Sequence, residues 1–424
     1  MSIYRIQGGI PLHGEVTISG SKNAALGVLA AAMAIDGPSV IENVPRVSDI
    51  ETLLRIFSKL GADVEWLSHD TVSIDPTKVT SPEALMPEVH ELRGSYYLLG
   101  AFLGRFSRVR QALPGGCNFG SRPIDLHLKG FTALGAANQR MTDEQIEIEA
   151  ERGLKGASIF LNVVSVGATI NIMLAAVHAE GVTVIDNAAK EPHIVDVANF
   201  LNAMGAEVRG AGTDVIKING KAVLPGRKTY AIIPDQIEAG TFMMMAPLTH
   251  GDIKVNNVIP THMEPLTNKL IEMGCLVEVG DDSIRTVLRP DETYTATTFK
   301  TMPYPGFPTD LQPQTVAMLC GAEGSGRVIE NVWDNRYQYI EHLQRMGANI
   351  MCSGRLAIIQ GGVPLKPATV PCRDLRAGAA MVMAALATEG ESVIEQIETI
   401  ERGYENFVQK LQGLGARISE ERSK

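Results

Sequence analysis

The chain has 424 residues, of which 45% are hydrophobic and 20% charged, enough apolar material for more than one hydrophobic core. Its net charge of -10 and its pI near 5.5 argue against nonspecific binding to nucleic acid or to an anionic membrane, because such binding needs a basic excess. We therefore expect two domains, and any phosphate-bearing ligand has to be held by a local group of cations.

The N-terminal segment has no apolar stretch of signal-peptide length, and the longest apolar run, residues 24–35, is too short to span a bilayer. The five cysteines, an odd number without a C-x-x-C pair, fit a reducing compartment better than a disulfide framework or a zinc site. We therefore expect a cytoplasmic protein without a metal site. Four of the cysteines have aliphatic neighbours and are expected to be small core residues: Cys275, Cys320, Cys352 and Cys372.

One amphipathic segment, which ends in Leu or Met followed by glycine, recurs six times along the chain. Successive glycines are 74, 70, 69, 73 and 68 residues apart. A regular period of this length predicts six copies of one structural unit, which together account for the whole chain. An ordinary doubly wound sheet with coincidental endings is the alternative, and the agreement of the spacings disfavours it. The glycines are Gly61, Gly135, Gly205, Gly274, Gly347 and Gly415.

Each unit contains two kinds of predicted helix. Ala-rich segments such as residues 24–34 are apolar on all sides and predict buried helices, whereas segments such as residues 266–274 have a polar face and predict outer helices. Glycines followed by β-branched stretches predict strands, most clearly in the units that start at Ser165 and Asp374. Three units per half is the natural grouping, with a boundary near residues 225–232 and a linker at residues 224–230.

Common cofactor and hydrolase motifs are missing from the sequence. The glycine-rich stretches GGCNFG and GAEGSG have the wrong spacing for a dinucleotide fingerprint, and the Gly-Ser-Lys of residues 20–22 lacks the upstream glycine of a P-loop. There is no H-E-x-x-H, EF-hand loop or G-x-S-x-G elbow either. Metal, NAD and serine-hydrolase chemistry are therefore unsupported.

A glycine-rich segment, LPGGCNFGSRPIDLH at residues 113–127, surrounds Cys117. A buried structural cysteine usually has apolar neighbours, whereas the flanking glycines favour a bent and mobile backbone. This environment indicates that Cys117 belongs to a functional site.

Charged residues stand at the starts of the apolar helices, where a helix core would prefer none. Asp235 and Asp374 are explained equally well as N-caps, but Lys22 and Arg93 lie where the helix dipole opposes a cation. Convergent cations in an acidic protein imply a phosphorylated, polyanionic ligand. Further cations stand at equivalent ends of other repeats: Arg122, Arg376 and Arg402.

These residues resemble the enolpyruvyl transferases. The matching stretches run in the family's order over nearly the whole chain: GSKNAA, LPGGC followed by RPIDLH, SVGAT with NAAKEPHIVD, IIPDQIEAGT, YPGFPTD, DLRAGAA and ERGYE. The resemblance implies an α/β fold of two similar domains, each of three βαβαββ-type units in an inside-out α/β barrel, with the active site in the interdomain cleft. One domain would span residues 21–231 and carry the Cys117 loop. The other would comprise residues 1–20 and 232–424 and carry Asp310, Asp374 and Arg402.

Within this family the sequence is most similar to the branch that acts on UDP-N-acetylglucosamine. That branch transfers the enolpyruvyl group of phosphoenolpyruvate to the 3'-hydroxyl of the sugar and releases phosphate, the first committed step of peptidoglycan precursor synthesis. The reaction is an addition followed by an elimination, so it needs a general acid, a base and cations, but no cofactor. Phosphoenolpyruvate and the nucleotide sugar would be the partners, with neither nucleic acid nor membrane involved.

The resemblance implies four catalytic residues. Lys22 matches a lysine that contacts phosphoenolpyruvate, and Asp310 matches the carboxylate proposed as base for the sugar hydroxyl. Cys117 matches a loop cysteine implicated as proton donor or in product release, which is also the alkylation target of fosfomycin. Arg402 matches a cationic partner of phosphate or carboxylate.

The resemblance also implies a set of substrate-binding residues. Two departures from the family pattern are Val163, where some members carry a lysine near the nucleotide, and His193, where an acid is common and which we interpret as structural. The implied set is Asn23, Arg93, Arg122, Pro123, Ile124, Asp125, Leu126, Ser165, Val166, Gly167, Val332, Asp374 and Arg376.

Two competing functions remain open at this stage. A shikimate-3-phosphate enolpyruvyl transferase has the same fold but lacks a matching cysteine loop, so the segment around Cys117 argues against it. A catalytically silent, ligand-binding paralogue would be expected to have lost one of the four implied catalytic residues, and all four are present.

Overall fold

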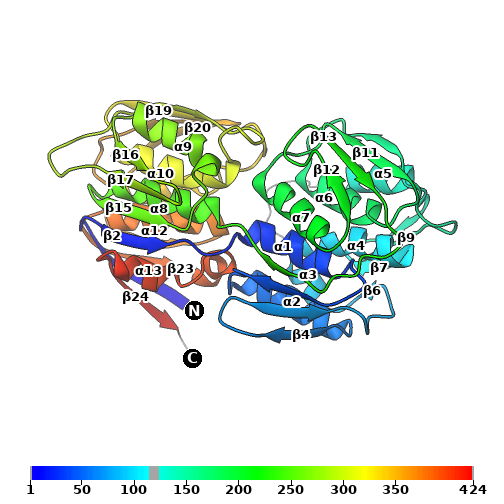
Figure 1. The fold of residues 1–424 in the computed structure, drawn as a ribbon. Helices are drawn as coiled ribbons and strands as arrows, with labels where there is room; N and C mark the ends of the chain where they lie inside the picture. Colours follow the sequence, from blue (N-terminus) through cyan, green and yellow to red (C-terminus); the bar gives the residue numbers. More distant parts are fainter. Residues whose placement is uncertain (1, 114–123, 423–424) are drawn as a thin grey trace. The chain divides into compact units, whose positions relative to one another are not determined.

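The computed structural model describes residues 2–113 and 124–422 (Figure 1). The chain forms two compact units: an inserted unit, Gly20–Ile233, and a terminal unit, Met1–Ser19 together with Pro234–Lys424. The terminal unit therefore combines both ends of the chain. No helix among the described residues is long and apolar enough to cross a membrane.

The described strands form six four-stranded sheets, three in each unit. In the inserted unit the sheets are β14(Thr229–Ala231)-β3(Ser39–Glu42)-β5(Val72–Asp75)-β4(Asp63–Trp66), β6(Glu83–Ala84)-β7(Arg108–Ala112)-β9(Gln145–Glu149)-β8(Asn138–Met141) and β10(Ser158–Phe160)-β11(Val182–Asp186)-β13(Val215–Asn219)-β12(Glu207–Arg209). In the terminal unit they are β2(His13–Thr17)-β15(Asp252–Asn256)-β17(Ser283–Val287)-β16(Leu276–Val279), β18(Thr298–Lys300)-β19(Ser325–Ile329)-β21(Leu356–Gln360)-β20(Asn349–Ser353) and β22(Thr369–Pro371)-β23(Gly390–Glu395)-β1(Ser2–Gly8)-β24(Arg417–Arg422).

All six sheets have the same topology, which confirms the six-fold repeat. In each, the first pair of strands is parallel and the next two pairs are antiparallel, as in β18-β19 followed by β19-β21 and β21-β20. Strand residues alternate between buried and exposed, so one face of each sheet packs on the core and the other faces solvent. Within the β19-β21 pair, the register places buried Val328 opposite buried Ala357.

Two classes of helix connect the strands, as the sequence predicts. Most inner helices are buried over almost their whole length, and the inner helices of one unit pack on each other. They are α1(Lys22–Ala32), α4(Tyr97–Phe106) and α6(Val166–Ala176), and α8(Gln236–Leu248), α10(Gln312–Gly321) and α12(Leu375–Ala387). Helices α1, α8 and α12 are buried because Ala, Gly and Met are frequent on every face. The outer helices are α2(Ser48–Lys59), α5(Asp125–Ala133) and α7(Pro192–Ala203), and α9(Pro260–Glu272), α11(Ile340–Arg345) and α13(Phe407–Gly413). Short helical segments complete the set: α3(Glu88–Glu91), η1(Arg93–Tyr96), η2(Thr309–Leu311) and η3(Ile397–Arg402).

The recurring glycine ends every outer helix by the same hydrogen-bond pattern. At the end of α2, Gly61 N–H donates to Ser58 O (3.1 Å) and Ala62 N–H donates to Phe57 O (3.0 Å), which is a Schellman motif. All six glycines have φ between +89° and +110°, a region that residues with a Cβ rarely adopt. The following small residue turns back toward the core, which explains why the repeat reads Gly-Ala.

Two expectations from the sequence are wrong. The segment 224–230 is no linker, since Leu224 is fully buried in the inserted unit and Thr229–Ala231 forms β14 beside β3. Cys352 is exposed, because it lies on edge strand β20 with its side chain away from the core. The other three named cysteines are buried, as expected.

Two glycines at the end of α13 provide a matched test of the helix stop. Gly415 has φ of +92° and Gly413 lies in the helix, and a Cβ added at either position would meet no atom within 4 Å. We expect Gly415→Ala to lower the free energy of unfolding by about 1–2 kcal/mol, because only the backbone conformation opposes it. Gly413→Ala is expected to raise it by about 0.4–1 kcal/mol. Denaturant unfolding measures both, and an equal effect of the two substitutions would contradict this account.

Candidate active site

In the inserted unit, Lys22 begins inner helix α1 and forms a buried ion pair. Its Nζ lies 2.6 Å from Asp49 Oδ2, and both side chains are only 9% exposed. Asp49 lies in the first turn of α2, where the helix dipole also favours its charge. The carboxylate therefore offsets the cost of placing a lysine at the start of α1.

Arg93 begins η1, which leads into inner helix α4. A Cβ added at Gly94 would lie 2.9 Å from Leu26, so η1 packs directly on the first turns of α1. The Arg93 guanidinium lies 5.5 Å from the ring centre of Tyr96, and the Tyr96 ring lies 6.4 Å from that of His127. The starts of α1 and of η1 therefore lie side by side, with His127 close to Arg93.

His127 is a buried and neutral imidazole. Its pKa is lowered from 6.5 to about 4, chiefly by burial and in addition by the positive charge of Arg93, while Asp125 opposes the shift. The Asn171 amide fixes the tautomer: Gly100 N–H donates to Asn171 Oδ1 (2.8 Å), so Asn171 Nδ2 faces His127 Nδ1 (2.9 Å) and donates to it. The remaining proton of the ring is therefore on Nε2.

His127 Nε2 lies against the start of inner helix α6. A Cβ added at Gly167 would be 2.9 Å from this nitrogen, so the glycine leaves space for the ring. Ser165 is the N-cap of α6, and its hydroxyl accepts a hydrogen bond from Ala168 N–H (3.3 Å). The structure thus gathers the predicted residues 124–126, at the start of α5, and 165–167 around His127. Asn23 is the second residue of α1.

Three predicted residues lie outside the described part of the chain: Cys117, Arg122 and Pro123. Val163, the departure near the predicted nucleotide site, is 66% exposed just before α6. His193 lies in the first turn of α7 and is half-buried.

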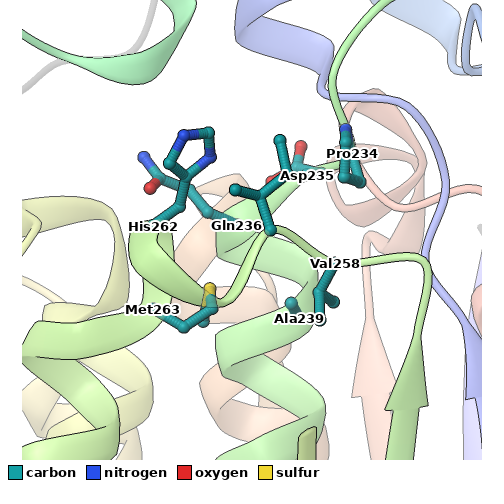
Figure 2. Close-up of a pocket in the computed structure, with 8 residues that line it drawn as sticks. Pro234, Asp235, Gln236, Ala239, Val258, His262 and Met263 are labelled. Carbon is teal, nitrogen blue, oxygen red and sulfur yellow. The ribbon is translucent and has the colours of Figure 1, made fainter. Parts of the chain in front are cut away.

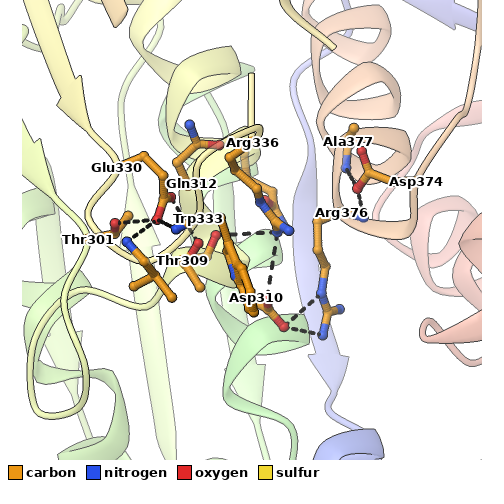
Figure 3. A network of polar contacts seen from close by, with 12 residues as sticks. Thr301, Thr309, Asp310, Gln312, Glu330, Trp333, Arg336, Asp374, Arg376 and Ala377 are labelled. Carbon is orange, nitrogen blue, oxygen red and sulfur yellow. Dashed lines mark hydrogen bonds and ion pairs between the residues drawn. The ribbon is translucent and has the colours of Figure 1, made fainter. Parts of the chain in front are cut away.

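In the terminal unit, Asp310 lies in η2 immediately before inner helix α10 (Figure 3). Arg376 donates to Asp310 Oδ2 from Nε (3.3 Å) and from Nη2 (3.1 Å), and Arg336 Nη2 lies 3.6 Å from Oδ1. The two arginines are 4% and 3% exposed, whereas the Asp310 side chain is 30% exposed. Two buried cations therefore orient a carboxylate that solvent can still reach.

Buried polar groups connect this carboxylate to the other inner helices. The Arg376 guanidinium lies 5.6 Å from the Tyr404 ring centre, and the Tyr404 hydroxyl contacts Thr241 of α8 (2.9 Å) and Gln314 of α10 (3.1 Å). Burial opposes the charge of Arg376, but the carboxylate of Asp310 and the further groups around it raise its pKa overall. Arg402 ends η3 two residues before Tyr404. We call Asp310, Arg336, Arg376 and Tyr404 the Asp310 cluster.

Asp374 and Asp235 are the N-caps of α12 and α8. Asp374 Oδ1 accepts from Arg376 N–H (3.0 Å) and Ala377 N–H (2.9 Å), and Asp235 Oδ1 accepts from the N–H groups of Ile237 and Glu238. The capping explanation therefore holds for both. Capping uses one oxygen of Asp374 and places the residue beside Arg376.

A pocket of about 160 Å³ lies where α8 and α9 begin (Figure 2). That volume includes open solvent, and the pocket has almost no enclosed space that admits a water molecule, whereas typical small-molecule sites enclose about 300–1,000 Å³. It therefore lacks the volume for a nucleotide sugar. Its lining residues are Pro234, Asp235, Gln236, Ala239, Val258, Ile259, His262 and Met263. Within the described ranges, no group of three His, Cys, Asp or Glu side chains could hold a metal ion.

Sequence reasoning missed four polar residues at these sites. His127 ends the RPIDLH stretch and Arg336 follows Val332 by four residues, so both had a nearby signal. Asp49 has the pattern of an ordinary acid in the first turn of a helix. Glu330 follows a strand of common composition, and its importance comes only from residues that the fold brings to it.

The neutral state of His127 predicts a pH dependence of stability. Between about pH 4 and 6.5 only the unfolded state takes up the proton, so the free energy of unfolding should fall as the pH falls through this window. The loss is of the order of 3 kcal/mol. His127→Gln keeps an acceptor for Asn171 but does not titrate, so its stability should fall less. Denaturant unfolding of both proteins at pH 7, 5.5 and 4.5 isolates the effect; parallel pH profiles would show that His127 is not the group responsible.

Known proteins resemble this chain over nearly its whole length. Residues 6–411 match the family model of EPSP synthase (3-phosphoshikimate 1-carboxyvinyltransferase). The UDP-N-acetylglucosamine 1-carboxyvinyltransferase 3 of Caldanaerobacter subterraneus is 52% identical over 99% of both chains, and the UDP-N-acetylglucosamine 1-carboxyvinyltransferase of Clostridium botulinum is 49% identical over 99% of both. The UDP-N-acetylglucosamine 1-carboxyvinyltransferase 2 of Bacillus subtilis is 48% identical over 100% of this chain and 97% of its own.

Solved structures give the same result for the fold. The enolpyruvyl transferase NikO from Streptomyces tendae superposes with a TM-score of 0.90 at 25% identity, covering 100% of this chain and 99% of that one. EPSP synthase from Acinetobacter baumannii shares the fold with a TM-score of 0.77 at 20% identity, and all of both chains is covered. With the family model spanning nearly the whole chain and full-length relatives near 50% identity, this chain belongs to the enolpyruvyl transferase family, among the UDP-N-acetylglucosamine 1-carboxyvinyltransferases.

Proposed function

We propose that the chain transfers the enolpyruvyl group of phosphoenolpyruvate to the 3'-hydroxyl of UDP-N-acetylglucosamine and releases phosphate. The geometric observation that carries the proposal is the Asp310 carboxylate, which two buried arginines hold at the start of α10 while leaving it partly exposed. A fixed, accessible carboxylate suits the removal of a hydroxyl proton. Relatives near 50% identity over the full length support the choice of acceptor. The odd number of cysteines without a C-x-x-C pair supports a cytoplasmic location.

The reaction has two steps in which the atoms balance. In the addition, the sugar oxygen bonds to C2 of phosphoenolpyruvate, its proton passes to Asp310, and an acid delivers a proton to the methylene carbon. In the elimination, the C2–O bond to phosphate breaks and the departing phosphate takes up one proton, which balances the one that Asp310 accepted and then releases. The methyl carbon returns a proton to the acid, and the enolpyruvyl ether and inorganic phosphate result. The substrate carries carboxylate and phosphate charge throughout, so cations are needed in both steps.

Each unit carries predicted site residues of a kind that this reaction needs. In the inserted unit, Lys22 and Arg93 would supply positive charge for binding a phosphate. His127, which lies close to Arg93, stays neutral near pH 7, so its charge does not change when the phosphate binds. Cys117 and Arg122 would supply the acid and a further cation from the segment between β7 and α5. In the terminal unit, Arg376 and Arg402 would stabilise the developing charge next to Asp310. The nucleotide would be contacted by residues 122–126, by residues 165–167 at the start of α6, and by Val332.

The acceptor is decided by a phosphate-release assay. We expect phosphoenolpyruvate with UDP-N-acetylglucosamine to release phosphate and phosphoenolpyruvate with shikimate 3-phosphate to release none above background. Mass spectrometry of the nucleotide product should show the added enolpyruvyl group. Release with shikimate 3-phosphate alone would identify the competing acceptor, and binding of both ligands without release would favour the silent paralogue.

Asp310→Ala tests the proposed base. We expect phosphate release to fall by about 10²-fold or more, because a positioned base contributes about 10²–10⁴-fold. Both substrates should still bind, since the two arginines keep their charge and gain freedom to contact anions. Calorimetric titration measures the binding and the phosphate assay measures the turnover. Near-normal turnover of the variant would remove Asp310 from the mechanism.

A further inference from the structure

A second acidic residue, Glu330, lies behind Asp310 and is completely buried at the end of β19. Its two carboxylate oxygens accept four hydrogen bonds. Oε1 accepts from Thr301 Oγ1 (2.9 Å), Val332 N–H (2.8 Å) and Trp333 N–H (3.0 Å), and Oε2 accepts from Thr309 Oγ1 (2.9 Å). Figure 3 shows these donors converging on one side chain.

The Glu330 carboxylate has no basic side chain at ion-pair distance among the residues that the structure describes. A buried charge without a cation is costly, and hydrogen-bond donors alone must replace its water. A hydrophobic side chain at this position would leave the N–H groups of Val332 and Trp333 without their acceptor. The four donors, and the segments that carry them, therefore require an explanation beyond packing.

The donors come from three segments of the chain, which all contribute a hydrogen bond to Glu330. Thr301 follows β18, Thr309 is the first residue of η2, and the two backbone N–H groups begin the loop after β19. Asn331 adds two bonds to Thr301, from its N–H to Oγ1 (2.9 Å) and from Nδ2 to the carbonyl oxygen (3.0 Å). The carboxylate thus fixes the start of this loop against the segment that contains η2.

Both segments lead directly to the Asp310 cluster. Thr309 is adjacent to Asp310 in the chain, and the loop after β19 carries Arg336. Arg336 Nη2 returns to η2, where it reaches the carbonyl oxygen of Thr309 (3.4 Å) and the carboxylate of Asp310 (3.6 Å). Glu330, η2 and Arg336 therefore form a closed ring of contacts that includes Asp310.

We propose that Glu330 is a positioning residue, which sets the orientation of Asp310 through Thr309 and of Arg336 through the loop after β19. The proposal rests on the proposed function, in which Asp310 accepts the hydroxyl proton. We call the hydrogen bond from Thr309 to Glu330 Oε2 the Oε2 arm and the hydrogen bonds to Oε1 the Oε1 arm. The Oε2 arm acts on Asp310, so it governs turnover. The Oε1 arm, through the N–H groups of Val332 and Trp333, also sets the predicted nucleotide contact of Val332.

A pair of substitutions at Thr309 separates positioning from packing. Thr309→Val has nearly the same volume but no hydroxyl, so the bond to Glu330 Oε2 is lost; Thr309→Ser keeps the hydroxyl. We expect Thr309→Val to lower kcat by about 10-fold or more, since a misplacement of about 1 Å can cost about 10²-fold. The KM values should change by less than about 2-fold, because the Oε1 arm stays intact. Thr309→Ser should keep kcat within about 2-fold of the kcat of the original protein.

Substitutions at Glu330 itself test the Oε1 arm. Glu330→Gln keeps an oxygen for the three Oε1 donors and turns its amide to Thr309, whose hydroxyl can accept, so it should resemble Thr309→Ser. Glu330→Ala loses both arms, so kcat should fall and the KM for the nucleotide sugar should rise together. Asp196→Ala is the matched control for stability: it removes a buried carboxylate of the inserted unit that accepts from Tyr230 and Ile233, and these hydrogen bonds involve no residue of the Asp310 cluster. It should lower the unfolding midpoint without lowering kcat.

Steady-state kinetics, unfolding midpoints and a crystal structure of Thr309→Val complete the experiment. The proposal predicts that kcat follows the hydroxyl at position 309 and that the 3.1 Å contact between Asp310 and Arg376 is displaced in Thr309→Val. It is overturned if Thr309→Val turns over normally. It is also overturned if the control loses as much kcat as Thr309→Val for the same loss of stability. If the original protein releases no phosphate with either acceptor, the proposed function fails; the crystal structure still decides the positioning, and an unmoved Asp310 overturns it.

Discussion

The inner helices impose the constraint on which the rest of the structure depends. The inner helices α8, α10 and α12 are buried on every face, so they pack on one another and sheets and outer helices enclose them. The sheets then form the surface of the unit, which is why their strands alternate between buried and exposed residues. Each repeat enters its inner helix from the same kind of strand. The predicted site residues Asp310 and Asp374 therefore recur at equivalent helix starts.

Much of the fold could be predicted from the sequence because helix stops are a local property. Six Schellman endings need a glycine with positive φ, and that requirement leaves a visible period. The exchange of strands between the two chain ends has no local signal: β1 pairs with β23 and β24, and β14 returns to β3 across most of a unit. The segment 224–230 has the Gly and Pro of a linker, yet Leu224 is in the core. Composition predicts a turn, but only the partner strand decides where a unit ends.

Only part of the candidate site could be predicted from the sequence. Cations at helix starts stand out because they oppose the dipole, and the structure shows how one is tolerated, since Asp49 pairs with Lys22. Partners of this kind are invisible in the sequence, because an acid in the first turn of a helix is ordinary. His127 and Glu330 were missed for the same reason. Their roles depend on Arg93 and Asn171 in one unit and on Thr309 in the other, which are distant in the chain.

The three inner helices of the terminal unit show how repetition can leave one residue available for chemistry. Each is preceded by an aspartate: Asp235, Asp310 and Asp374. Asp235 and Asp374 accept N–H groups of their own helices, so their carboxylates are engaged in capping. Before α10 the extra turn η2 moves Asp310 away from the helix end, and the helix begins without a side-chain cap. Its carboxylate is held instead by arginines from other segments, which orient it without covering it. Helix α10 therefore lacks a side-chain cap, and the position of the Asp310 carboxylate is set by tertiary contacts instead.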